Sequence, residues 1–399
     1  MRFSDLFICS SRPKIAVLGD FLLDVYTIGK AKRISPEAPV AVLHVEREEM
    51  KAGGAGNVCV NLESLGADVV SIGRVGDDLA GRELQSMLKG SLLVQKGFAT
   101  PKKNRMVSDD QQIVRVDHET VLPLDRALEE KLIRELPKLL ADVSIVAVSD
   151  YGKGFVTHAL FQRLISLSKE LDFQVIVDPK GADFSKYFGA TVIKPNLGEA
   201  YAASSLDLGA PLEDVAEKLL EFAKVVLITR SGEGLSLFQG KDQTHYPAAV
   251  REVKDVTGAG DTVLAVFCFA LARKLTLHEA ASLANVAGGL SVEHVGCAKL
   301  TLGEIARQLL RENLVDKVID GAHKDVLLAA MQDKECHSLH LKEPFGIDAK
   351  TFYALSGVGR EGKDLLLHVS PDLATKERLD WLSSLAFVRW IVVGEQSAL

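Results

Sequence analysis

The chain has 399 residues and a mass of 43.2 kDa, and its 47% hydrophobic and 25% charged residues exclude a disordered, collagen-like or disulfide-stapled protein. Its 47 basic and 54 acidic residues give a formal charge of −7, so we expect no nucleic-acid partner, because proteins that bind nucleic-acid phosphates are usually basic. A local cationic pocket for a small phosphorylated substrate is compatible with this charge.

Cysteine usage and hydropathy both bear on the compartment of the protein. The five cysteines include no CxxC pair, which indicates reduced thiols and argues against structural zinc. The first residues, MRFSDLFICSSRPK, contain an apolar run too short for a signal peptide, and no apolar stretch in the chain reaches 18 residues. We therefore expect a cytoplasmic location and no membrane partner.

Short β-rich apolar runs alternate with helical segments along most of the chain. The expected strands are residues 14–20, 68–76, 142–154, 173–181, 190–196 and 224–234. The expected helices include residues 125–141, 158–171 and 211–223. This alternation predicts an α/β fold with a mostly parallel sheet flanked by helices. Each apolar run ends in polar or Gly residues, at the edge where such sheets bind ligands.

Two segments, 36–50 and 104–118, interrupt this alternation. Apolar and polar residues alternate in both, which predicts strands with one solvated face. They form either a small separate sheet that covers the site as a lid or edge hairpins of the main sheet. We favour the lid and expect a homodimer formed through it.

The composition changes after about residue 315. Both tryptophans, Trp381 and Trp390, lie beyond that point, and residues 316–364 have weak periodicity. DLLLHVSPD, KERLDWLSSLAF and VRWIVVG then predict a strand, a helix and a strand. We therefore expect a first domain of residues 1–314 and a C-terminal α/β subdomain of residues 315–399.

The segment DVTGAGDTVLAVFCFALA, residues 255–272, carries the strongest chemical signal. The turn from Gly258 to Gly260 precedes an apolar helical run, so its backbone N–H groups can bind an anion at a helix N-terminus. Asp261, in the first helical turn, could take a proton from a hydroxyl that attacks a phosphoryl group. Alternatively, Asp261 only caps the helix.

Other polar groups follow expected strands. GGAGN, with Gly53, Gly54 and Asn57, suits sugar hydroxyls or phosphate but also fits a tight loop, and Asp24 follows the first strand. In KPNLGE, Asn196 and Glu199 are three residues apart, and Glu199 could hold Mg²⁺ through water. The same pair could equally be a capping Asn and a first-turn Glu.

Together, GGAGN, NLGE and DVTGAGD resemble the ribokinase-like (PfkB) carbohydrate kinases, over about residues 12–312. GDFLLDVYTIGKAKRISPEAPVAVL, SDYGKG, DPKGADF and TRSGEGLSL are similar to the heptose 7-phosphate kinase branch of that family. The resemblance implies ATP-dependent phosphorylation of D-glycero-D-manno-heptose 7-phosphate at its anomeric hydroxyl. The product would be the 1,7-bisphosphate used in ADP-heptose and lipopolysaccharide core synthesis.

The resemblance also implies a role for each matching residue. It makes Asp261 the catalytic base and gives the anion hole to Gly258, Ala259 and Gly260. The residues implied for ATP and Mg²⁺ are Asn196, Glu199, Thr229, Ser231, Gly232 and, near the adenine, Asn285. Those implied for the sugar are Asp24, Gly53, Gly54 and Asn57, and those for a monovalent cation such as K⁺ are Asp255 and Thr257.

The chain departs from that branch in three places. Gly296-Cys297 replaces a Gly-Thr pair, which we expect to reshape the adenine pocket, and SDDQQ (108–112) brings two acids into the lid. The tail resembles a nucleotidyltransferase domain, but Ala349-Lys350-Thr351-Phe352 stands where that domain has His-x-Gly-His. We expect a degenerate transferase domain, the alternative being an unrelated packing extension.

A phosphorylated acceptor needs cationic contacts at its far end. Arg33 and Lys153, in polar loops after apolar runs, are the candidates, although a solvated loop lysine is equally compatible with the sequence. Two other functions stay open: a ribokinase-like kinase for another sugar or nucleoside, and a binding protein that has lost catalysis.

Overall fold

The computed structural model describes residues 12–109, 111–248, 253–294, 296–313, 318–319, 327, 336–341, 344–359, 364–385 and 387–394. These fall into two compact units, one made of residues up to Leu300 and one of residues from Thr301 onward. No helix in these ranges is long and apolar enough to cross a bilayer.

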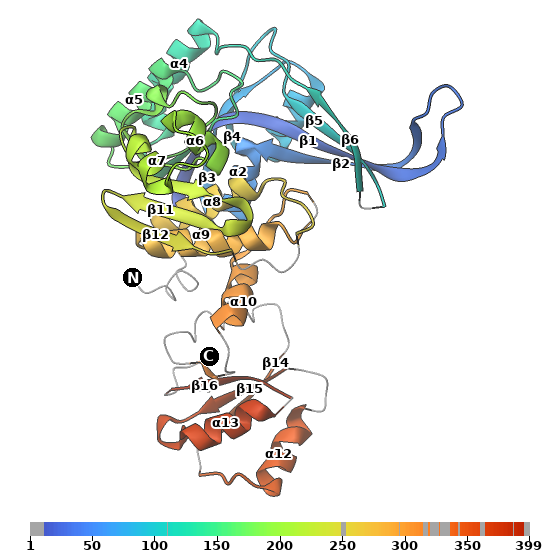
Figure 1. Cartoon of the computed structure of the whole chain (residues 1–399), viewed down its shortest axis with the longest axis vertical. Helices are drawn as coiled ribbons and strands as arrows, with labels where there is room; N and C mark the ends of the chain where they lie inside the picture. Colours follow the sequence, from blue (N-terminus) through green and yellow to red (C-terminus); the bar gives the residue numbers. More distant parts are fainter. Residues whose placement is uncertain are drawn as a thin grey trace. The chain divides into compact units, whose positions relative to one another are not determined.

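The first unit is built on a mostly parallel sheet with the order β12-β11-β10-β9-β8-β7-β1-β3-β4 (Figure 1). Its strands are β1 (Lys14–Ile34), β3 (Asp68–Val75), β4 (Gly90–Val94), β7 (Ile145–Ser149), β8 (Gln174–Asp178), β9 (Ala190–Ile193), β10 (Ala223–Thr229), β11 (Leu235–Gln239) and β12 (Asp242–Tyr246). The strands from β10 to β4 pair in parallel, whereas β11 and β12 add an antiparallel hairpin at one edge. The α/β prediction is confirmed.

Helices cover both faces of this sheet. One face carries α4 (Arg126–Leu139), α5 (His158–Glu170), α6 (Leu197–Ser204) and α7 (Leu212–Leu219). The other face carries α2 (Ala55–Ser64), α8 (Ala259–Ala272) and α9 (Leu277–Ser291), and α3 (Leu79–Met87) follows β3. The helices expected at 125–141, 158–171 and 211–223 are therefore present.

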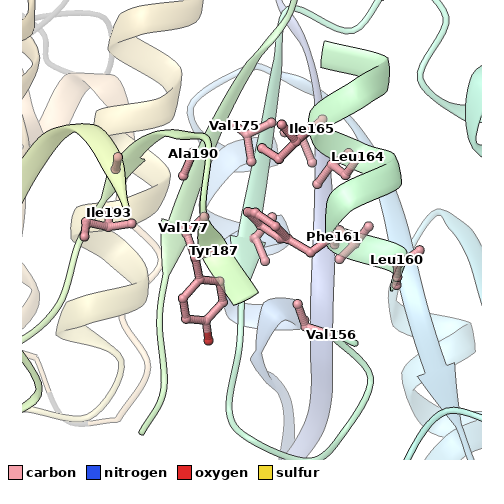
Figure 2. Packing of buried hydrophobic residues seen from close by; sticks show 14 of the residues in the cluster. Val156, Leu160, Phe161, Leu164, Ile165, Val175, Val177, Tyr187, Ala190 and Ile193 are labelled. Carbon is pink, nitrogen blue, oxygen red and sulfur yellow. The ribbon is translucent and has the colours of Figure 1, made fainter. Parts of the chain in front are cut away.

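The packing of α5 on the sheet shows why these segments are helical (Figure 2). Thr157 caps the helix by accepting a hydrogen bond from the backbone N–H of Leu160 at 3.1 Å. Phe161 and Leu164 lie on the apolar face of α5, and the Phe161 ring meets the Tyr187 ring edge-on with centroids 5.6 Å apart. Replacing Phe161 by Ala would cost about 3–5 kcal/mol, because the surrounding core could only partly collapse.

A second, smaller sheet projects from the main one, and we call it the lid sheet (Figure 1). It consists of β1 from Phe21 onward, β2 (Ala41–Gly54), β5 (Lys102–Ser108) and β6 (Gln111–His118). β1 is far longer than the expected strand 14–20, because it leaves the main sheet after Asp20 and continues into the lid sheet. The separate small sheet is therefore confirmed, and the alternative of edge hairpins is wrong.

The two lid segments differ from their expected bounds for identifiable reasons. β2 begins only at Ala41, because Pro36 and Pro39 lack the N–H groups that a strand donates. Segment 104–118 is a hairpin rather than one strand, and Asp109, at φ 49°, occupies its turn. Asp tolerates this left-handed conformation better than most residues.

The second unit contains a four-stranded parallel sheet with the order β13-β16-β15-β14. Its elements are α10 (Leu302–Asn313), β13 (Val318–Ile319), β14 (Cys336–Leu341), α12 (Ala349–Gly359), β15 (Asp364–Val369), α13 (Lys376–Ser384) and β16 (Val388–Val393). Buried Leu365 and Leu367 of β15 pack with Leu382 of α13 and Ile391 of β16. The strand–helix–strand pattern expected near the C-terminus is therefore present.

Candidate active site

The start of α8 is shaped by a glycine turn. Gly258 precedes the helix with φ 75°, a conformation that L side chains rarely adopt. A Cβ on Gly258 would lie 2.6 Å from Nδ2 of Asn57 and 3.2 Å from Sγ of Cys297, so the site has no room for a side chain here. The turn thus brings the first N–H groups of a long, buried helix close to Asn57 and Cys297, where the helix dipole favours negative charge.

Asp261, in the first turn of α8, is buried with 3% exposure. Its Oδ2 accepts a hydrogen bond from Nδ2 of Asn57 at 3.0 Å, and its Oδ1 accepts one from the hydroxyl of Tyr151 at 2.8 Å. Both carboxylate oxygens are therefore bonded to side chains of other elements. The helix cap is Gly258, without a side-chain hydrogen bond.

The electrostatic surroundings of Asp261 suit a proton acceptor. Burial raises the pKa of its carboxyl to about 7, with a further upward contribution from Asp178, against the hydrogen bonds from Asn57 and Tyr151. A carboxyl with a pKa near neutrality can both accept and release a proton at physiological pH. This is the environment that a general base requires.

Lys194 and Asp178 form an ion pair close to the glycine turn. Nζ of Lys194, directly after β9, is 3.0 Å from Oδ2 of Asp178, the last residue of β8. A Cβ on Gly260 would be 3.7 Å from that ammonium group. Burial raises the pKa of Asp178 to about 6, while Lys194 lowers it. Sequence reasoning assigned no role to this pair, although both residues follow directly on apolar strands.

A cavity of about 380 Å³ opens beside this ion pair. Its lining includes eight residues expected in the phosphoryl and nucleotide sites, namely Asn196, Glu199, Thr229, Ser231, Gly232, Ala259, Gly260 and Asn285. Lys180, Asp178 and Lys194 line the same cavity. The structure thus gathers the predicted nucleotide residues from α6 and its cap, the end of β10 and the turn after it, α8 and α9 around one space.

Asn196 and Glu199 form a capping box at the start of α6, the alternative that the sequence left open. The Asn196 side chain accepts from the N–H of Glu199 at 2.9 Å, and Oε2 of Glu199 accepts from the N–H of Asn196 at 3.1 Å. Oε1 of Glu199 also pairs with Nζ of Lys180 at 2.7 Å. Each carboxylate oxygen keeps a further lone pair, so Glu199 can still bind the waters of a metal ion.

The residues expected at the sugar do not line the cavity and lie at the base of the lid sheet, namely Asp24, Gly53, Gly54 and Asn57. Asp24 forms a buried ion pair with Arg105 of β5, and a Cβ on Gly53 would lie 2.0 Å from Oδ2 of Asp24. Gly54, at φ 56°, precedes α2, which carries Asn57. Among the four expected sugar-site residues, Gly53 thus contacts Asp24 and Asn57 contacts Asp261.

Cys297 lies in this second group and not where the sequence led us to expect it. Its Sγ is 3.7 Å from Oδ2 of Asp24, and it is absent from the residues that line the cavity. Burial, with the neighbouring carboxylates of Asp24 and Asp261, raises the pKa of the thiol, which therefore stays protonated. The expected effect of Cys297 on the adenine pocket is corrected to an effect on the Asp24 side.

The structure does not bring Arg33 and Lys153 into this group as free cations. Nζ of Lys153 pairs with Oε1 of Glu119 at 2.7 Å, and its backbone N–H donates to Asp20. Arg33 is exposed near the far end of β1, on the order of 30 Å from Asp24 at the usual rise of a strand.

Asp255 and Thr257, expected at a monovalent cation site, form a tight loop before α8. Oδ1 of Asp255 accepts from the N–H of Thr257 at 2.9 Å, and Oδ2 accepts from the N–H of Gly296 at 2.9 Å. Asp255 therefore joins two loops that flank the glycine turn. No cluster of three or more potential metal-ligating side chains occurs among the residues that the structure describes.

Comparisons with known proteins agree with this geometry. A model of the pfkB family of carbohydrate kinases matches residues 12–302. A protein of Campylobacter jejuni subsp. doylei named "Bifunctional protein HldE" is 42% identical over 333 residues, which are 82% of this chain and 71% of the relative.

Solved structures show the same fold at low sequence identity. Escherichia coli phosphofructokinase-2, in a complex with potassium, superimposes with a TM-score of 0.63 at 18% identity, covering 75% of this chain and 99% of that one. Ribokinase from Giardia lamblia gives a TM-score of 0.61 at 19% identity, covering 76% and 100%. The expectation of a ribokinase-like fold is confirmed.

Proposed function

The chain belongs to the pfkB family of carbohydrate kinases, and on that premise we propose that it phosphorylates D-glycero-D-manno-heptose 7-phosphate with ATP. The acceptor is the anomeric C1 hydroxyl, and the products are the 1,7-bisphosphate and ADP. This reaction would supply ADP-heptose synthesis for the lipopolysaccharide core. The HldE relative supports this choice of acceptor, since 82% of this chain aligns with it.

The position of Asp261 is the observation that carries the proposal. Its carboxylate bonds Asn57 on one side and Tyr151 on the other, between the cavity and the group of residues around Asp24. A phosphoryl donor in the cavity and a sugar beside Asp24 would therefore meet at this carboxylate. Proximity of this kind supplies much of the rate enhancement in phosphoryl transfer.

In the proposed reaction, proton removal and phosphoryl transfer take place in one step. Asp261 takes the proton of the attacking hydroxyl as the new oxygen–phosphorus bond forms, and the bond between the γ-phosphorus and the ADP oxygen breaks. Charge develops on the transferring group next to the N–H groups of the Gly258–Gly260 turn and the ammonium of Lys194. Donors positioned in this way stabilise a transition state more than the ground state.

We propose ATP as phosphoryl donor, with Mg²⁺ and a monovalent cation such as K⁺. The cavity offers Thr229, Ser231 and Gly232 for the nucleotide, and the Asn285 side chain at its edge donates to the Pro247 carbonyl at 2.8 Å. Mg²⁺ would neutralise charge on the β- and γ-phosphates. The free lone pairs of Glu199 fit its hydration shell, whereas Asp255 and Thr257 are the candidates near K⁺.

We also propose that two chains associate through the lid sheet. The register of β1 with β2 and β5 places Met50, Val114 and Val116 on the face opposite Asp24, and they are 45%, 48% and 38% exposed. Apolar side chains gathered on one face of a sheet are typical of a surface that another chain covers. Sedimentation should give a dimer for the native chain and a monomer for Val114→Glu.

The test of the reaction is a coupled ADP-release assay. Heptose 7-phosphate should give a kcat/KM at least about 100-fold above those for ribose and adenosine, since a site built for charged groups rejects acceptors that lack them. It should also be preferred over fructose 6-phosphate, which carries a phosphate on a different sugar. A preference for another member of this panel would favour the alternative kinase. ATP binding without turnover of any acceptor would favour a catalytically silent binding protein.

For residues 315–399 we propose a degenerate nucleotidyltransferase domain. The N-terminus of α12, where Ala349 to Phe352 stand in place of His-x-Gly-His, is capped by Asp348, whose Oδ1 accepts from the N–H of Thr351 at 2.8 Å. A carboxylate at this position repels the nucleotide phosphates that such a helix end would otherwise attract.

The purified chain should therefore transfer no nucleotide from ATP or CTP to heptose 1-phosphate. Detectable transfer would refute the loss of this activity. A chain ending at residue 314 should retain kinase activity if it stays folded, since the residues assigned to the reaction lie between Asp24 and Cys297.

A further inference from the structure

The lid sheet presents a row of charged side chains beside Asp24. β2 and β5 flank β1 on its two sides, with Lys51 and Lys103 both opposite Asp24 in the register. Directly opposite residues in neighbouring strands point to the same face, so both lysines share the face of Asp24. Neighbouring strands lie about 4.8 Å apart, which puts the two lysine Cα atoms about 10 Å from each other.

Aromatic contacts hold the two ammonium groups over the acceptor side of the site. Nζ of Lys51 is 5.3 Å from the ring centroid of Tyr26, and Nζ of Lys103 is 5.4 Å from that of Tyr151. The hydroxyl of the same Tyr151 donates to Asp261. One tyrosine ring therefore separates the ammonium of Lys103 from the proposed base.

The acids of the lid sheet that share this face with the two lysines are already paired with arginines. Asp24 binds Arg105, while Asp117, opposite Lys103 on β6, accepts from Nε of Arg115 at 2.9 Å.

On the β2 side, Glu49 is opposite Tyr26 and binds Nε of Arg47 at 2.9 Å. Within the described residues, neither Lys51 nor Lys103 forms an ion pair. The face consequently carries two uncompensated positive charges.

A third group on this face lacks a partner. Tyr26 is buried with 5% exposure, and among the described residues nothing forms a hydrogen bond with its hydroxyl. Buried hydroxyls are nearly always hydrogen-bonded, so an orphaned one points to a bound molecule. Its oxygen would be 2.9 Å from a Cβ on Gly296, next to Cys297 and hence to Asp24.

We propose that Lys51 and Lys103 clamp the phosphate group that the acceptor already carries, with the Tyr26 hydroxyl available to the same ligand. This inference rests on the proposed function and specifies the acceptor as a phosphorylated sugar. It replaces Arg33 and Lys153 as the phosphate contacts. The hydroxyl to be phosphorylated lies at Asp261 and the existing phosphate lies across the Tyr151 ring, under the lid sheet.

The test is steady-state kinetics of Lys51→Met and Lys103→Met in the full chain. Methionine keeps the length of the side chain and its contact with the ring but removes the charge. Each variant should raise KM for heptose 7-phosphate about 10-fold, the effect of one charge-assisted hydrogen bond, with KM for ATP unchanged within about two-fold. Lys103→Arg should restore most of the affinity.

Lys102→Met is the matched control, because Lys102 is opposite Leu23 and so belongs to the other face of the same strand. A KM increase for Lys102→Met as large as for Lys103→Met would overturn the proposal, as would unchanged KM values in both site variants. Melting temperatures of all variants should match the native chain. If a methionine variant does not fold, the corresponding glutamine variant takes its place.

Experiments with inorganic phosphate test the role of the two lysines independently of which sugar phosphate is the substrate. It should inhibit the native chain competitively against the sugar phosphate, and the double variant should lose that inhibition. If the native chain turns over no sugar phosphate, the proposed reaction is wrong, and calorimetry with inorganic phosphate then decides on the lysines alone. Saturable binding that the double variant loses supports the clamp, and no binding to the native chain refutes it.

Discussion

Replacement of Asp261 by asparagine removes one charge from the centre of the site with little change in shape. In the native chain Asn57 donates to one carboxylate oxygen and Tyr151 to the other. In Asp261→Asn the amide oxygen can accept from Asn57, while the amide nitrogen donates to the Tyr151 hydroxyl, which can rotate to accept. Both contacts survive, and the ability to take a proton is lost.

The loss of the carboxylate should change both the rate of the reaction and the stability of the fold. A positioned general base contributes about 10²–10⁴ in rate, so kcat should fall at least about 100-fold. The pKa of about 7, against an ordinary value of 3.8, corresponds to roughly 4 kcal/mol of preference for the neutral form. The folded chain therefore binds a proton here that the unfolded chain releases, and stability falls as pH rises from about 4 to about 7.

Two assays follow from this reasoning. The kcat/KM of the native chain should rise with pH up to about 7, as Asp261 ionises, and the variant should lack this limb of the profile. The melting temperature of Asp261→Asn should exceed that of the native chain at pH 8, and the gain should disappear toward pH 4. Near-native kcat in a folded Asp261→Asn chain would refute the assignment of the base.

Three further changes probe other parts of the site. Gly53→Ala places a methyl group 2.0 Å from Oδ2 of Asp24 and should raise KM for the acceptor at least about 10-fold in kinetic assays, without changing KM for ATP. Glu199→Gln should shift the Mg²⁺ concentration for half-maximal activity upward, and an unchanged titration would count against a role at the metal. Arg74→Met should lower the free energy of unfolding by about 1.5–3 kcal/mol in urea titrations, because the buried guanidinium donates charged hydrogen bonds to Gln95 at 2.8 Å and to the Lys153 carbonyl at 2.6 Å, whereas each acceptor keeps a backbone donor, Asp125 and Leu122 respectively. A loss below about 1 kcal/mol would contradict that account.

The elements with a local signal were the ones that sequence could predict. The period of apolar residues marked β8 and α5 within a few residues, because each packs a regular face on the core. The length of β1 was not predictable in this way, since residues 21–34 leave one sheet and enter another, and that change depends on the partners β2 and β5.

The residues of the candidate site likewise fall into those with a local sequence pattern and those that depend on contacts distant in the chain. Asp261 and the glycine turn could be found because a helix N-terminus has a recognisable local pattern. Asp178 and Lys194 gain their meaning only when β8 and β9 pair, so each looked like an ordinary polar residue after a strand. Cys297 was placed wrongly for the same reason: its neighbour Asp24 is 273 residues away in the chain.

The continuity of β1 has a mechanical consequence. Asp20 is its last residue paired with the main sheet, and Phe21 is its first paired with β2. The main sheet and the lid sheet are therefore joined by two consecutive residues of one strand, and any hinge between the sheets lies at this point. The lid sheet cannot swing as an independent flap, because rotation about this segment also displaces Asp24, a few residues further along. If Asp24 holds the sugar as proposed, grip on the sugar and exclusion of water are a single motion, and an acceptor that Asp24 cannot hold would leave the site open to water.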